Sequence, residues 1–372
     1  MPLRILEFGD NYAAGYAGKL FARWGAEVIR VDAVDTEPAF PHRTEHTAVD
    51  LYLHAGKTRM AIDYGKPAGR QLLHRLAAKV DILITDLSAA DLDLLDWTSL
   101  GGSDLKIRTA ITPFGLQGPR RDWVATSNVL LAMGGQTFLM GDPGRAPLTM
   151  PGRYIFYQSG QYAYTASLAT HRLQPTDTQT IDVSMYETAL SLHQFTTVMW
   201  TFGGNIRSRH GNDFGVLHPI TMYPCKDGWF AVNADILFWD AFTIMLGKPE
   251  LADDPQFATV AARVENCKEL DAIVMEQLGD KTRREVLDLG QEVCRMPTGI
   301  LTTLDELLQD PHLEERDFWQ TIAVDGRELK VPGSAFRYVG ESPPAQPKPK
   351  APVDAGVFIA PSLARAGESS HD

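Results

Sequence analysis

Short apolar segments that alternate with helical segments constrain the fold of this chain most strongly. Residues 3–8 form an apolar run, and Gly9 breaks it. Residues 13–24 have helical spacing, and Gly25 separates them from a second apolar run at residues 27–31. One crossover helix with short loops requires the two strands to pair in parallel. The chain therefore begins as an α/β sheet of Rossmann type.

The same alternation continues through the first half of the chain. Further strands are expected at residues 60–62, 80–84, 106–111 and 180–185, and helices at residues 69–79, 124–133, 157–171 and 186–200. Residues 202–219 are loop-like. A turn followed by a strand is expected over residues 227–232, and two or three amphipathic helices extend from there to about residue 308. We predict a large Rossmann-type domain over residues 1–221 and a smaller α+β domain over 222–325. Residues 326–372 are predicted to be a C-terminal return segment with a mobile tail.

Charge and composition exclude several classes of function. The 372 residues have a formal net charge of −12, and a nucleic-acid partner would require a concentrated basic surface. No apolar run is long enough to cross a membrane, and the N-terminus enters a strand pattern without a signal peptide. We therefore expect a cytoplasmic protein without a membrane or nucleic-acid partner. The three cysteines are widely spaced and indicate neither a disulfide framework nor a metal site.

Five stretches, in order between residues 3 and 266, resemble the family III CoA-transferases, the group that includes formyl-CoA and carnitine CoA-transferases and the methylacyl-CoA racemases. The five are residues 3–32, which end in WGAEVIRVD, 56–63 (GKTRMAID), 112–119 (TPFGLQGP), 223–229 (YPCKDGW) and 247–266, which begins GKPEL and ends RVEN. Each stretch is weak evidence alone, but their order and spacing are specific.

The resemblance implies both an architecture and a chemistry. Family members are two-domain chains that interlock as ring-like dimers, with CoA lying against the Rossmann-type domain. An aspartate attacks the acyl-CoA thioester, and the resulting aspartyl-CoA thioester transfers CoA to the acceptor acid. Such covalent catalysis divides one difficult exchange into easier steps.

This sequence departs from the family at the nucleophile. The family places the aspartate four residues before a glycine that opens a helix of small residues. That glycine is Gly160 here, and Phe156 occupies the nucleophile position. Residues 153–158 (RYIFYQ) contain no carboxylate, and phenylalanine cannot attack a thioester. The racemases of the family also use a histidine after the "GP" motif, and residues 120–124 (RRDWV) contain none.

The expected CoA contacts are also altered. The family's "ENxxPG" segment reads TDLSAA at residues 85–90, which places Asp86 where CoA phosphates would be repelled. The remaining candidates for phosphate contacts are basic residues, and each of them is also compatible with a role as a solvated surface charge: Lys57, Arg59, Arg30 and Arg108. His218, expected between the two domains, is a candidate general base, and its alternative role is to stabilise a loop.

Three functions fit these observations. The first is the non-catalytic subunit of a heteromeric CoA-transferase, paired with a homologous chain that retains the aspartate. The second is a divergent lyase, hydratase or isomerase acting on a CoA thioester, and the third is a transferase that uses another carboxylate. We prefer the first, with a small organic acid as co-substrate, and aromatic or bulky acids are included in this expectation. The CoA thioester would then be bound weakly or by the partner only, and a homodimer is the alternative assembly.

Overall fold

This computed structural model describes residues 2–9, 12–33, 43–324 and 327–340. The described residues form two compact units. Unit 1 contains those within 1–137, 149–204 and 312–372, and unit 2 contains 138–148 and 205–311. The boundaries expected from the sequence, after residues 221 and 325, stay predictions. The C-terminal tail lies outside the described residues.

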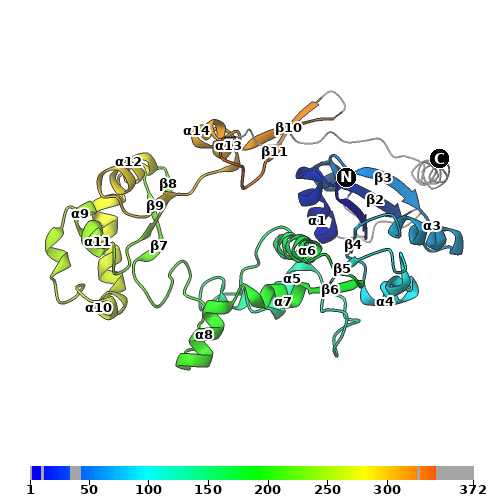
Figure 1. Ribbon diagram of the computed structural model, residues 1–372. Coiled ribbons are helices and arrows are strands. Elements are labelled where there is room, and N and C mark those ends of the chain that lie inside the picture. Colours follow the sequence, from blue (N-terminus) through cyan, green and yellow to red (C-terminus); the bar gives the residue numbers. More distant parts are fainter. Residues whose placement is uncertain (1, 10–11, 34–42, 325–326, 341–372) are drawn as a thin grey trace. The chain divides into compact units, whose positions relative to one another are not determined.

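Unit 1 is organised around one parallel sheet (Figure 1). Its strands are Arg4–Phe8 (β1), Glu27–Ala33 (β2), Thr58–Ile62 (β3), Ile82–Thr85 (β4), Ile107–Thr112 (β5) and Gln179–Ser184 (β6). They are ordered β3-β2-β1-β4-β5-β6, and every neighbouring pair is parallel. This confirms the expected α/β class. The strand order reverses between β1 and β4, and ligands of such sheets commonly bind at the carboxyl ends of strands near that point.

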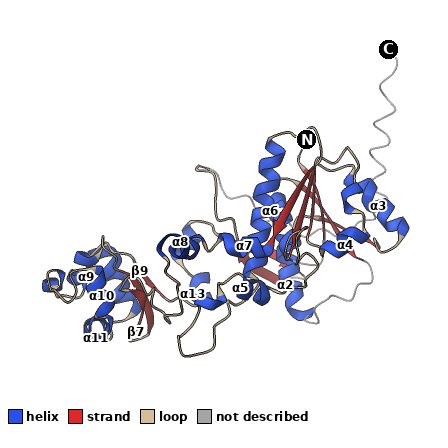
Figure 2. Ribbon diagram, turned by 90° about the horizontal axis from the view of Figure 1, so that it is seen from below, coloured by secondary structure: helices blue, strands red, loops and turns tan. Residues whose placement is uncertain are grey.

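Helices cover both faces of this sheet. They are Tyr12–Arg23 (α1), Arg43–His54 (α2), Pro67–Ala77 (α3), Ala89–Leu94 (α4), Ser127–Met133 (α5), Tyr154–Arg172 (α6) and Met185–Ser191 (α7). A further helix, Gln194–Gly203 (α8), follows α7 and has no buried residue. Alternate residues of β1 point to opposite faces: Ile5 joins the core beneath α1 and α6, whereas Leu6 and Phe8 join the core beneath α3 and α4. Figure 2 shows α6 and α3 on opposite sides of the strands.

Helix α6 packs closely against α1. Its buried positions include Ser159, Gly160 and Ala163, which are small. A Cβ atom added to Gly160 would lie 2.5 Å from the backbone oxygen of Ala13 in α1. The small-residue helix expected from the sequence is therefore present, and its glycine permits the close crossing of α1 and α6.

A β-hairpin completes unit 1 and was not expected from the sequence. It consists of Trp319–Val324 (β10) and Arg327–Pro332 (β11), and it follows a short helix at Pro311–Glu315 (α14). Ile322 and Val331 of the hairpin pack with Ala55 and Tyr52. The chain therefore returns to unit 1 after it leaves unit 2.

Unit 2 contains an antiparallel sheet covered by short helices. The strands are Ile220–Cys225 (β7), Gly228–Asn233 (β8) and Thr298–Ile300 (β9). The helices are Trp239–Met245 (α9), Val260–Glu265 (α10), Cys267–Leu278 (α11), Arg283–Asp288 (α12) and Leu304–Leu308 (α13). Short helical turns occur in unit 2 at Pro249–Ala252 (η3) and Leu289–Val293 (η4). Two others are Trp97–Ser99 (η1) in unit 1 and Thr137–Leu139 (η2) where the chain passes from unit 1 to unit 2. Phe230, Phe242 and Leu270 lie in the core of unit 2.

Within the described part of the chain, no helix combines the length and the apolar character that a membrane crossing requires.

Candidate functional site

The switch point of the sheet is the place between β1 and β4 where the strand order reverses. A carboxylate of the protein itself lies there. Asp86 follows β4 and is buried, and its Oδ2 accepts a hydrogen bond of 2.9 Å from the backbone N–H of Ala14. Ala14 lies in the first turn of α1, where folds of this type commonly bind a phosphate. Because Asp86 already satisfies this N–H and is itself negatively charged, a ligand phosphate is disfavoured at the start of α1.

A cavity of about 510 Å³ lies beside the switch point, at the carboxyl ends of β2, β3 and β4. Ala33 and Ile62 end β2 and β3, and Leu87 follows β4, so these strand ends form its base. The remaining lining residues come from the β3–α3 connection, from α3 and from α4 with the residue after it: Asp63, Tyr64, Gly65, Arg70, Asp91, Leu94 and Leu95. Largely apolar walls with a few polar groups are typical of a pocket for a small organic ligand.

Below α1, a buried cluster of charges engages two of the basic residues expected to bind CoA. The Glu7 carboxylate is fully buried and accepts hydrogen bonds from Lys57 Nζ at 2.5 Å and Arg30 Nη1 at 3.1 Å. Lys57 also donates to the backbone oxygen of Gly15. A Cβ atom on Gly18 would lie 1.7 Å from Glu7 Oε2, so a glycine at this position of α1 makes room for the carboxylate. The cluster ties β1, β2, α1 and the start of β3 together.

The surroundings of this cluster shift the pKa values of its bases. Burial lowers the pKa of Lys57 to about 8, although Glu7 opposes the shift by favouring the ammonium form. Burial also lowers the pKa of His54 well below its ordinary value, and the neighbouring Lys57 adds to the effect. His54 Nδ1 lies 3.3 Å from Lys57 Nζ, so a neutral imidazole is the form that this site accommodates.

Arg59 and Arg108 are also engaged within unit 1. Arg59 Nε donates to Asp32 Oδ2 at 2.8 Å, and Asp32 also receives a hydrogen bond from Arg30. Arg108 is the second residue of β5 and therefore lies near the amino edge of the sheet, opposite the edge that holds the cavity. Its Nη2 donates to the backbone oxygen of Leu100 at 3.2 Å. CoA contacts by Lys57, Arg59, Arg30 and Arg108 stay predictions, and their observed contacts favour structural roles.

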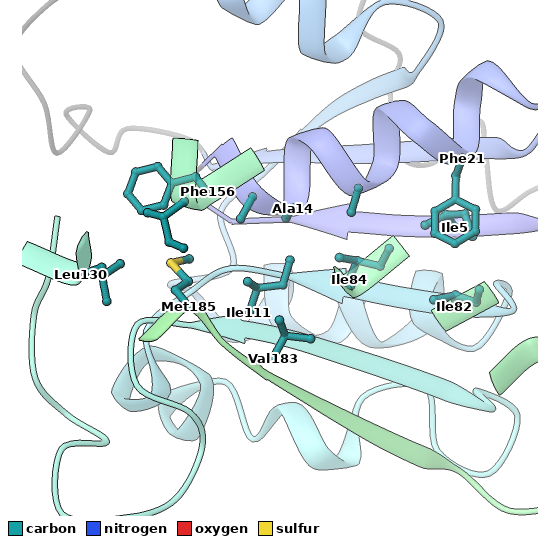
Figure 3. Close-up of a cluster of buried hydrophobic side chains, with 14 of the residues drawn as sticks. Ile5, Ala14, Phe21, Ile82, Ile84, Ile111, Leu130, Phe156, Val183 and Met185 are labelled. Atoms are coloured by element: carbon teal, nitrogen blue, oxygen red, sulfur yellow. The ribbon is translucent and has the colours of Figure 1, made fainter. Parts of the chain in front are cut away.

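The residue at the family's nucleophile position is part of the apolar core. Phe156 is 8% exposed and lies in the first turn of α6. Figure 3 shows its side chain near those of Met185 and Leu130, at one end of the core beneath α1. The first turn of α6 contains no acidic residue. Around it, the Arg153 guanidinium lies 3.7 Å from the centre of the Tyr12 ring, and Tyr16 contacts Tyr157 edge to face.

His218 belongs to a separate polar network in unit 2. It is 4% exposed, and its Nε2 lies 3.1 Å from Asp271 Oδ1 in α11. Tyr223 of β7 donates its hydroxyl to the same oxygen at 2.6 Å. Burial raises the pKa of Asp271, but the nearby His218 and the hydrogen bond from Tyr223 outweigh this effect and hold the pKa below its ordinary value. A carboxylate that orients a histidine is compatible with either catalysis or structural support, so the role of His218 stays a prediction.

Replacing Asp271 with asparagine is expected to lower the stability of unit 2 at pH 7 by about 1–2 kcal/mol, because the hydrogen bond from Tyr223 and the contact of His218 with this partly exposed carboxylate are weakened. The wild-type contribution is present above the unfolded pKa of about 3.9 and is lost as the pH falls through the lower folded pKa. Thermal unfolding from pH 7 to pH 3 checks this, with the exposed Asp253→Asn as control. Equal acid sensitivity of wild type and Asp271→Asn would refute the assignment.

The structure is an α/β fold with a cavity at the carboxyl edge of its parallel sheet, the edge where folds of this class commonly bind small ligands. Comparison with known proteins identifies the family. A family model described as "CoA-transferase family III" matches residues 2–354. The chain belongs to this family.

Curated relatives agree with that assignment. The chain is 31% identical over 330 residues to the succinyl-CoA–D-citramalate CoA-transferase of Chloroflexus aurantiacus, covering 84% of this chain and 81% of that protein. It is 27% identical to subunit BbsE of the succinyl-CoA:(R)-benzylsuccinate CoA-transferase of Thauera aromatica, covering 87% and 84%. It is also 28% identical to the alpha subunit of the succinyl-CoA–L-malate CoA-transferase of Chloroflexus aurantiacus, covering 89% and 80%.

Solved structures share the fold. Rv3272 from Mycobacterium tuberculosis superimposes with a TM-score of 0.81 at 23% identity, covering 96% of this chain and 97% of that chain. A CaiB/BaiF family protein from Brucella suis gives a TM-score of 0.79 at 23% identity, covering 97% and 98%. These likenesses confirm the fold.

The sequence interpretation did not identify several residues that define these sites. Glu7 lies in an apolar run, and a charged residue within a strand that is otherwise buried is the available signal for it. Asp271 and Tyr223 come together only through the folding of unit 2. Arg70, which lines the cavity, lies on a helix whose polar residues gave no reason to single it out.

Proposed function

We propose that this chain is the non-catalytic subunit of a heteromeric CoA-transferase that moves CoA between a thioester and an organic acid. The observation that supports this most directly is the burial of Phe156 in the core at the start of α6, where no carboxylate is present in the first turn. Without a nucleophile there, the chain cannot form the aspartyl-CoA thioester that the family's mechanism requires. The catalytic carboxylate would come from a homologous partner.

We infer that CoA, where this chain binds it, places its adenosine in the cavity at the carboxyl edge of unit 1. Apolar walls provided by Ala33, Ile62 and Leu87, together with the Tyr64 ring, suit a nucleoside. Asp63 and Asp91 also line the cavity and oppose a polyphosphate. Affinity for CoA is therefore expected to be weak, with a Kd of about tens of micromolar or above, which corresponds to roughly 6 kcal/mol of binding free energy or less.

Helix α8 supports association with a second chain. None of its residues is buried, although the helix is predominantly apolar. Val198, Trp200 and Phe202 are 58%, 54% and 93% exposed. Large apolar side chains exposed together on one helix are typical of an interaction site in a globular protein. Because the malate CoA-transferase relatives are named as alpha and beta subunits, the occupant we propose is a homologous chain that retains the nucleophilic aspartate.

Coexpression with such a homologue tests the proposal. The expected product is a complex of the two different chains that transfers CoA, whereas this chain alone shows no transfer. Mass spectrometry during turnover should find the enzyme–CoA thioester on the partner chain only. Phe202→Asp should prevent assembly because it places a charge in an apolar interface, and size-exclusion chromatography with light scattering would detect this.

Leu173→Asp is the matched control, because Leu173 directly follows α6, lies outside α8 and is 82% exposed. It should leave assembly intact. A stable homodimer of this chain that turns over an acyl-CoA unaided would contradict the proposal and would favour a divergent enzyme on the same fold. His218→Ala would then be the first variant to examine.

A further inference from the structure

A second hollow adjoins the cavity at the carboxyl edge. It has a volume of about 620 Å³ and extends along α3, where Arg70, Gln71, His74 and Arg75 face Asp96, Ser99 and Leu100. The cavity and the hollow share two lining residues, Arg70 and Leu95. Arg70 therefore stands at the junction between a largely apolar pocket and a more polar groove.

Arg70 differs in its pairing from four other basic residues of this part of unit 1. Arg30, Lys57 and Arg59 are bound to Glu7 or Asp32, and Lys66 pairs with Asp63 at 2.6 Å. Arg70 Nη1 donates to the backbone oxygen of Gly65 at 2.9 Å, and among the described residues no carboxylate pairs with its guanidinium. The other nitrogens of the guanidinium can therefore bind an anion without breaking an ion pair.

The starts of α3 and α6 indicate where the thioester arm and the 3′-phosphate of a bound CoA molecule would lie. α6 precedes β6 and α3 precedes β4, so both helices begin at the carboxyl edge of the parallel sheet. The arm of CoA that ends in the thioester has to run along this edge toward the start of α6, where the family's chemistry occurs. The other branch of CoA is the phosphate on the 3′ oxygen of its ribose. Since the thioester arm leads toward α6, the part of CoA that enters the hollow along α3 is the 3′-phosphate.

We propose that Arg70 binds the ribose 3′-phosphate of CoA and makes this chain prefer CoA over dephospho-CoA. The planar guanidinium donates two parallel hydrogen bonds that match phosphate oxygens. The first turn of α3 contains no acidic residue, so nothing in that turn repels the dianion. Arg70 is then a specificity-determining residue that recognises the nucleotide far from the thioester. This inference rests on the proposed placement of adenosine in the cavity.

Isothermal titration of the full-length protein, in the oligomer in which it purifies, with CoA and with dephospho-CoA tests the assignment. Wild type should bind CoA at least about tenfold more tightly, as expected for a charge-assisted contact. Arg70→Gln should remove the preference, so that both nucleotides bind with the wild-type affinity for dephospho-CoA. Arg70→Lys should retain part of the preference. The wild-type preference should also weaken as salt is raised from 50 to 500 mM.

Arg75→Gln is the matched control, because it makes the same change in charge on the same helix and lies in the hollow but not in the cavity. It should keep the preference. Loss of the preference in Arg75→Gln, with retention in Arg70→Gln, overturns the role of Arg70. Equal binding of both nucleotides to wild type also overturns it and leaves the adenosine site intact. Failure of wild type to bind either nucleotide overturns the adenosine placement and the role of Arg70 together.

Discussion

Replacing Glu7 with alanine will destabilise unit 1 by about 3–5 kcal/mol, because it leaves buried cations without their counter-charge. Lys57 and Glu7 are both fully buried, and their charged atoms are 2.5 Å apart. Arg30 would lose its contact with Glu7 and keep the one with Asp32. The Lys57 ammonium would be left with backbone oxygen and imidazole partners only, so its proton would be lost more readily and the packing of α1 on β1 would weaken.

Hydrogen exchange followed by mass spectrometry can locate this effect in peptides that cover residues 4–23. Glu27→Ala is the matched control, because Glu27 pairs with Arg4 at 3.2 Å in a partly exposed ion pair. Such pairs contribute about 1 kcal/mol or less. The double variant Glu7→Gln, Lys57→Met should recover part of the lost stability, since it removes both buried charges. A cost of Glu7→Ala as small as that of Glu27→Ala would show that the cluster does not stabilise the fold.

The parallel sheet could be predicted from the sequence because its strands are buried on both faces. The strands β1, β2, β4 and β5 each contain buried Ile, Leu or Val residues. Parallel strands joined by a crossover helix are connected with a right-handed turn in nearly all proteins, which leaves few topologies to consider. The helix expected over residues 186–200 is instead two helices, α7 and α8, separated at Leu192 and His193. β7, β10 and β11 were missed, since strands in small antiparallel sheets are polar on one face and give weak patterns.

The sequence predicted the features of the candidate site that depend on a single residue, but not those that depend on a pair of residues far apart in the chain. The absence of a carboxylate before Gly160 can be read directly from residues 153–158. The fate of the basic residues cannot, because Lys57 meets a carboxylate 50 positions away and Arg30 one that is 23 positions away. A sequence shows that a lysine is present but does not show which acid has already neutralised it. Arg70 emerges as a candidate only after these pairs are known.

Introducing aspartate at position 156 will not create a transferase, and it will destabilise the chain by about 4 kcal/mol or more. Phe156 lies among apolar side chains, and removing a buried phenylalanine ring costs roughly 3–5 kcal/mol by itself. The new carboxylate would add the cost of an unpaired buried polar group. Soluble yield and the midpoint of thermal unfolding should both fall. A carboxylate in the core is also unable to align with a thioester or with groups that stabilise its oxyanion.

Two further variants separate stability from chemistry. Phe156→Leu keeps the position apolar and should cost much less than Phe156→Asp. Tyr154→Asp places a carboxylate on the first residue of α6, which is 36% exposed, where the helix dipole favours a negative charge. It should fold with a stability within about 1 kcal/mol of wild type. CoA exchange between an acyl-CoA and an organic acid, followed by chromatography, should remain at background for all three variants. A folded Phe156→Asp protein that forms an enzyme–CoA thioester and turns over would show that only the carboxylate had been lost from an otherwise intact site.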